Sequence, residues 1–196
     1  MHLVFDIFQG MGIAAAVGIR PFLPALVVGA LAAGNVEIHF NGTDYSFLQG
    51  TPFLLAMCAG AVVVAIAERR LIRDRLDHGP GLVVLGVIAL ALGAVLFAGS
   101  LARGHYAGWP GLIGGVICAA IGIAATVPLL RRVRGRLDPA SAAAVPLYAE
   151  AAALLLAALS VVAPPVGLIG VLALLWLLLA GRSREQQKYA GLRILR

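Results

Sequence analysis

Two charged residues lie inside apolar stretches, where they could bind a solute or each other. Arg20 interrupts the apolar run from Leu3 to Ala33, and Glu150 lies in the apolar run that follows Pro139. An ionisable side chain at membrane depth is costly and usually faces an interior path or an opposite charge. Because two unpaired charges would cost more than a pair, we expect Arg20 and Glu150 to pair across a helical bundle. Alternatively, such a pair only fixes helix register and binds nothing.

The backbone beside Arg20 is interrupted by Pro21 and Pro24. Each proline lacks an N–H and leaves the carbonyl four residues earlier without its helical donor. In hydrocarbon such carbonyls are tolerated only where protein or water satisfies them, so this backbone should line a cavity or an interface. The arginine would suit an anionic solute and the freed carbonyls a cation, and both alternatives stay open. A simpler interpretation places Arg20 in the cytosolic turn of a short hairpin.

The elements that position these residues follow from helix lengths. A continuous helix from Asp6 to Ala33 would be about 42 Å long, against a hydrocarbon core of about 30 Å. The segment is also too short for two spans of about 20 residues each. It should therefore be a helix broken at Arg20-Pro21 or a re-entrant hairpin of two half-helices. Glu150, about 17 Å along its helix from Pro139, should lie near the midplane.

The composition excludes an ordinary soluble domain, since 61% of the 196 residues are hydrophobic and only 12% are charged. The chain is predicted to be one all-α polytopic membrane domain with about six spans. We expect the spans at 6–33 (broken), 51–68, 80–102, 109–130, 139–163 and 166–181. The Asn41-Gly42 pair between alternating apolar runs predicts a β-hairpin or ordered loop at 35–50, outside the bilayer.

The distribution of basic residues predicts the orientation. Thirteen of the 15 Lys and Arg residues lie in the loops at 69–79 and 131–138 and in the tail at 182–196, whereas Arg103 lies on the opposite side. By the positive-inside rule these loops and the C-terminal tail are cytosolic. One broken first crossing gives six crossings and a cytosolic start; a full hairpin gives seven crossings and an outer start. Six crossings could form a 3+3 inverted repeat, as in many secondary transporters.

Three further features bear on chemistry. Tyr148 could contact a solute beside Glu150, and Glu68 at the end of the second span could gate a cytosolic mouth, although core packing and pairing with nearby arginines are the simpler roles. Cys58 and Cys118 have no His or Cys partner at metal-ligand spacing, so we expect no metal and no cofactor. The basic residues lie at span ends rather than among stacking aromatics, which argues against a nucleic-acid partner.

The case for an enzyme is weak. The stretch Asp74-Arg75-Leu76-Asp77-His78-Gly79 is superficially similar to the metal-binding motif of membrane phosphatidyltransferases. However, His78 interrupts the motif and no second paired-aspartate motif follows. The chain also lacks P-loop, HExxH and GxSxG signatures.

Several segments together resemble a known family. They are Gly18-Ile19-Arg20-Pro21-Phe22-Leu23-Pro24, Glu68, the stretch from Pro146 to Glu150, Pro164-Pro165 and the tail Lys188-Tyr189-Ala190-Gly191-Leu192-Arg193. Over essentially its whole length the chain resembles the integral-membrane family catalogued as domain of unknown function 4126. The resemblance implies a bacterial cytoplasmic-membrane protein and brings no established activity. Other members have a longer acidic sequence where this chain has its arginine-rich loop after the second span.

These observations favour a transporter or channel for a small solute or ion, with its site near the midplane at Arg20 and Glu150. The second candidate is a non-catalytic membrane subunit or scaffold that binds partner helices and anionic lipid. A lipid-modifying enzyme is the third. Gly-rich helix faces also suggest a homo-oligomer in the lipid bilayer.

Overall fold

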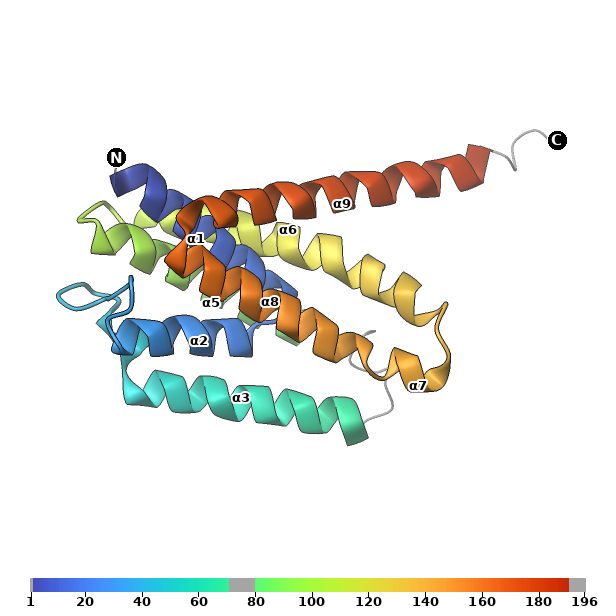
Figure 1. Cartoon of the computed structure of the whole chain (residues 1–196), viewed down its shortest axis with the longest axis horizontal. Coiled ribbons are helices and arrows are strands. Elements are labelled where there is room, and N and C mark those ends of the chain that lie inside the picture. Colours follow the sequence, from blue (N-terminus) through green and yellow to red (C-terminus); the bar gives the residue numbers. More distant parts are fainter. Residues whose placement is uncertain (1, 71–79, 191–196) are drawn as a thin grey trace.

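The computed structural model describes residues 2–70 and 80–190, with side chains described for 3–67, 81–138 and 141–181. This part of the chain is helical, as expected (Figure 1). The elements are α1 (His2–Ile19), α2 (Phe22–Ala33), the short 3-10 helix η1 (Ser46–Gln49), α3 (Thr51–Arg70), α5 (Pro80–Arg103), α6 (Trp109–Arg134), α7 (Pro139–Ala142), α8 (Val145–Val162) and α9 (Pro164–Ala190).

The helices are those of a polytopic membrane protein. Within the described residues, four segments are long and apolar enough to cross a bilayer, namely Gly81–Arg103, Trp109–Arg134, Val145–Val162 and Pro164–Gly181. The apolar helices α1, α2 and α3 are shorter. Large apolar side chains such as Leu147 and Trp176 are 70% and 68% exposed, which fits a surface that faces lipid.

The first segment is broken at Arg20-Pro21, as predicted, and it folds back on itself. The Arg20 N–H still donates to the Ala16 carbonyl (3.1 Å), whereas Pro21 has no N–H with which to continue α1. At the far end, Arg103 of α5 donates both to Asp6 near the start of α1 and to the Glu37 carbonyl just after α2. The two ends of the segment therefore lie together and α1 and α2 are antiparallel (Figure 1). The first segment is therefore a hairpin of two helices, which was one of the alternatives from the sequence.

We call the two ends of the bundle the loop end, with Asp6, residues 34–50 and Arg103, and the basic end, with the arginines at 131–136. At the loop end no strand forms within residues 34–50, so the β-hairpin expectation is wrong and the ordered loop is correct. The Asn41-Gly42 turn does form, with Gly42 at φ 76°. Its flanks do not pair because the Phe40 N–H donates to the Gln49 side chain (2.9 Å).

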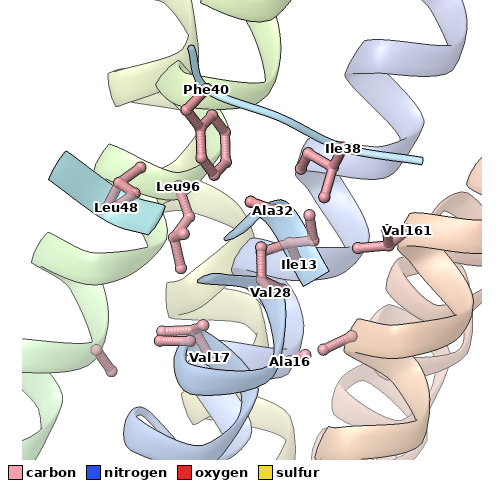
Figure 2. Packing of buried hydrophobic residues seen from close by; sticks show 13 residues of the cluster. Ile13, Ala16, Val17, Val28, Ala32, Ile38, Phe40, Leu48, Leu96 and Val161 are labelled. Atoms are coloured by element: carbon pink, nitrogen blue, oxygen red, sulfur yellow. The ribbon is translucent and has the colours of Figure 1, made fainter. Parts of the chain in front are cut away.

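The loop instead packs into the bundle. Ile38 and Phe40 are fully buried among residues of α1, α2 and α5, including Leu96 (Figure 2). A Cβ on Gly99 of α5 would lie 2.9 Å from the Phe40 ring, so the loop sits directly on the helix. The loop therefore closes this end of the bundle.

Helix α1 is the central element and packs against α5, α6, α8 and α9. Small residues permit this close packing: a Cβ on Gly18 would lie 2.2 Å from the Ala119 carbonyl oxygen, and a Cβ on Gly12 would lie 2.1 Å from the Ser160 hydroxyl. Such close backbone approach is how membrane helices commonly associate. The buried face of α6 includes Cys118, Gly122 and Thr126, which recur every four residues and so lie on one face of the helix.

The expected span at 139–163 is divided. Asp138 caps its start, since the Ser141 N–H donates to the Asp138 carboxylate (3.1 Å). However, α7 ends at Ala142 and α8 begins at Val145. Pro146 has no N–H for the Ala142 carbonyl, so a single helix could not continue through this point without losing a bond.

Candidate functional site: an arginine-lined cavity at the helix break

A cavity of about 90 Å³ lies between the α1–α2 break, the first half of α5 and the second half of α6. A buried water needs roughly 10–15 Å³ on this measure, so several waters or one small ion would fit. Drug-sized ligands occupy pockets of about 300–1,000 Å³, which excludes a large solute in this conformation. Apart from apolar side chains and backbone, the cavity is lined by Arg20, Thr126, Arg131 and Arg134.

Three guanidinium-bearing residues meet at this cavity from two elements. Arg20 is held at the break, where Pro21 also lines the wall. Arg131 and Arg134 are three residues apart near the end of α6 and so lie on the same helix face. Guanidinium groups stay protonated in proteins, and none of the lining residues that the structure describes is acidic. The described wall therefore bears three cationic side chains.

The break lies beside the second half of α6, and residues 19–23 around it are partly exposed. Arg20 follows Asp6 by fourteen residues, about 21 Å along a helix, whereas the hydrocarbon core is about 30 Å thick. A Cβ on Gly122, near the middle of α6, would lie 2.5 Å from the Ala15 carbonyl oxygen. Consequently α1 reaches the middle of α6 and turns back shortly beyond it. The cavity extends from that turn towards Arg134 at the basic end.

The other residues predicted from the sequence lie elsewhere. Pro24 is buried in α2, and Glu150 is partly buried on α8; neither is among the described cavity residues. The Arg20–Glu150 pair stays a prediction. The Tyr148 side chain is 73% exposed on the outside of the bundle. The side chain of Glu68, the stretch from Asp74 to Gly79 and the side chains of the basic tail at 182–196 lie outside the described residues.

The sequence did not predict the ion pair at the loop end. Arg103 Nη2 lies 2.7 Å from Asp6 Oδ1, and the side chains are 23% and 3% exposed, respectively. The pair joins the start of α1 to the end of α5 beside an open cleft, whose lining includes Asn35, Glu37 and His105. These three are the non-glycine residues with positive φ in the described part of the chain. Of the two alternatives for the first segment, only the hairpin would have placed Asp6 and Arg103 on the same side of the membrane.

In the sequence analysis, Arg131 and Arg134 served only to predict the orientation of the chain in the membrane. Their three-residue spacing could have indicated a shared face, but nothing in the sequence showed that Arg20 would lie opposite them. Gly86 also lines the cavity, and an added Cβ there would meet no atom within 4 Å. Nothing in the sequence around Gly86 indicated this position.

Comparisons with known proteins assign the chain to a family and not to an activity. No curated protein and no solved structure matches it significantly. The sequence model of one family, described as a domain of unknown function (DUF4126), matches residues 7–184 and thus includes α2, α3, α5, α6, α7 and α8 entirely. The chain belongs to the DUF4126 family.

Proposed function

We propose that this membrane protein passes a small anion across the bilayer, as a channel or a carrier, and that Arg20 binds the anion at the α1–α2 break. The observation that carries the proposal is the cavity of about 90 Å³ in which Arg20 is joined by Arg131 and Arg134. Helix breaks that line a cavity are the usual binding elements of secondary transporters.

The wall chemistry favours an anion over a cation. Pro21 frees the carbonyl of Val17, and this oxygen could coordinate a cation. Pro24 is the third residue of α2, where an N–H has no helical acceptor, so it frees no further carbonyl. However, Val17 is fully buried and is not among the described cavity residues. Clustered arginines raise the local concentration of anions, and a guanidinium offers up to five hydrogen-bond donors to a small oxyanion or halide.

The structure supports access from one end. Ile38 and Phe40 fill the loop end, whereas the cavity reaches the arginines of the basic end. By the positive-inside rule, the basic end and the C-terminal tail would be cytosolic, in the bacterial cytoplasmic membrane. In this proposal Glu150 is a counter-charge for Arg20, and the inverted repeat and homo-oligomer stay open predictions.

Anion flux into proteoliposomes tests the proposal. Purified protein should pass chloride, nitrate or formate and exclude gluconate and potassium. Arg20→Gln should lower the anion flux at least about tenfold, since it removes a charge-assisted contact. Gly86→Phe should block flux, because the added ring would occupy open cavity space.

The matched control is Val87→Phe, which adds the same ring one position along at a residue that is 60% exposed. It should retain flux. Thermal unfolding and gel filtration would verify that each variant is folded. Potassium flux that depends on Arg20, or the absence of both flux and anion-dependent thermal stabilisation, would overturn the proposal.

A further inference from the structure

The second half of α6 borders another hollow, on a different side from the Arg20 cavity. A groove of about 210 Å³ runs between α6 and α9 and is lined by Ala124, Pro128, Arg132, Leu177, Leu178 and Gly181, among others. Arg132 is its charged lining residue among those described, and the remaining walls are apolar.

The groove has a polar end and an apolar end. Arg132 lies against α9 because Gly181 has no side chain: a Cβ there would be 3.2 Å from Arg132 Nη2. In the sequence the apolar stretch of α9 ends at Gly181, where Arg182 follows, so Arg132 lies level with the first charged residue after that stretch. Ala124 is eight residues earlier, about 12 Å deeper along α6. The groove therefore runs from the charged ends of the apolar stretches of α6 and α9 towards their middle.

The arginines of α6 line two different hollows. Arg131 and Arg134 line the Arg20 cavity, whereas Arg132, turned by about 100° around the helix, lines the groove. The anion proposal does not use Arg132. The groove thus stands as a separate site, whether or not the anion proposal holds.

We propose that this groove binds one anionic phospholipid, with the phosphate at Arg132 and an acyl chain along Ala124, Pro128 and Leu177. Arginine matches a phosphate with two parallel hydrogen bonds. Basic pockets between membrane helices at the cytosolic side are suited to anionic headgroups. The apolar walls suit a chain and not a hydrated ion, so charge and shape together specify the occupant.

The two tryptophans of the chain provide a direct test. Trp176 lies on α9 next to the groove residue Leu177 and is 68% exposed, whereas Trp109 begins α6 at the opposite end and is 66% exposed. Full-length Trp109→Phe and Trp176→Phe variants would be placed in vesicles of phosphatidylcholine with a minor share of phosphatidylglycerol. Either lipid would carry brominated chains that quench tryptophan. At equal mole fraction, the brominated anionic lipid should quench Trp176 about fivefold more effectively than the zwitterionic one. Trp109 should show no such preference.

Matched variants separate the groove from the general positive surface. In the Trp109→Phe background, Arg132→Gln and Ala124→Phe should abolish the preference, the first by removing the charge and the second by filling the groove. Arg136→Gln and Ala120→Phe remove the same charge and add the same ring at exposed residues outside the described lining, and both should retain it.

Three outcomes would overturn the proposal. An unchanged preference in Arg132→Gln would exclude Arg132 as the headgroup contact. An equal loss in Arg136→Gln would indicate diffuse surface charge in place of a site. Competition by soluble glycerol phosphate would indicate a small-anion site that does not need the acyl chains.

Discussion

At the scale of single residues, removal of either charge of the Asp6–Arg103 pair should cost a different amount of stability, because the two side chains are buried to different extents. Asp6 is 3% exposed and Arg103 23%, and Arg103 also donates to the Glu37 carbonyl. Arg103→Gln would leave a buried carboxylate without its cation, so we expect a loss of about 3 kcal/mol in the free energy of unfolding. Asp6→Asn leaves a cation that is partly solvated and still has the Glu37 carbonyl, and should cost about 1–2 kcal/mol.

Unfolding of the purified variants in one detergent would measure both values. The double variant Asp6→Asn/Arg103→Gln should be more stable than Arg103→Gln alone, because neutralising the carboxylate removes the uncompensated charge. Equal losses in the two single variants would contradict this account of the pair.

Backbone strain at the loop end gives a second prediction. Glu37 is exposed and has φ 56°, a left-handed conformation that costs a residue with a Cβ roughly 1–2 kcal/mol. Glu37→Gly should therefore stabilise the protein, by about 0.5–1 kcal/mol after the greater freedom of glycine in the unfolded chain is subtracted. Asn35→Gly should gain less, because asparagine tolerates φ 53° better.

The control for this prediction is Val36→Gly, at the intervening exposed residue, which is not among those with positive φ. It should destabilise the protein, since glycine there only adds freedom to the unfolded chain. Thermal midpoints that fall for Glu37→Gly as much as for Val36→Gly would show that strain is not stored at Glu37.

At the scale of elements, the position of α1 depends on glycines that admit neighbouring backbone. An added Cβ at Gly18 would lie 2.2 Å from the Ala119 carbonyl oxygen, whereas one at Gly86 would meet nothing within 4 Å. Gly18→Ala should therefore lower stability by about 1–3 kcal/mol through overpacking. Gly86→Ala should raise it by up to about 1 kcal/mol through helix propensity. Unfolding measurements in which both variants lose stability equally would contradict the packing of α1 against α6.

Local patterns predicted the elements better than their mutual arrangement. The small residues Gly122 and Thr126 lie four positions apart on the packed face of α6, and Pro21 indicated where α1 must end. Both effects act within one or two helical turns and are therefore visible in the sequence. The Asn41-Gly42 signal predicted the turn and not its flanks, because the buried side chains of Ile38 and Phe40 pack on distant helices instead of pairing locally.

At the scale of the whole molecule, the unresolved question was the direction of the chain after Arg20. Segment length allowed a broken crossing or a hairpin, since 28 residues from Asp6 to Ala33 fit neither one straight span nor two full spans. Long-range contacts decide between them: Arg103 holds both ends of the hairpin. The cavity also depends on long-range contacts, because Arg20 approaches Arg131 and Arg134 only when the turn lies beside the middle of α6.

The hairpin fixes a topology that single-cysteine labelling can test. In a Cys58→Ala/Cys118→Ala background, Leu3→Cys and Asn41→Cys should react with a membrane-impermeant maleimide from the same side, since α1 starts and the loop lies at one end of the bundle (Figure 1). Arg136→Cys, exposed beyond the end of α6, should react only from the other side. By the positive-inside rule, that side is the cytosol. If Leu3→Cys instead reacted together with Arg136→Cys, the first segment would cross the bilayer once, and Arg20 could not stand at a turn facing the basic end.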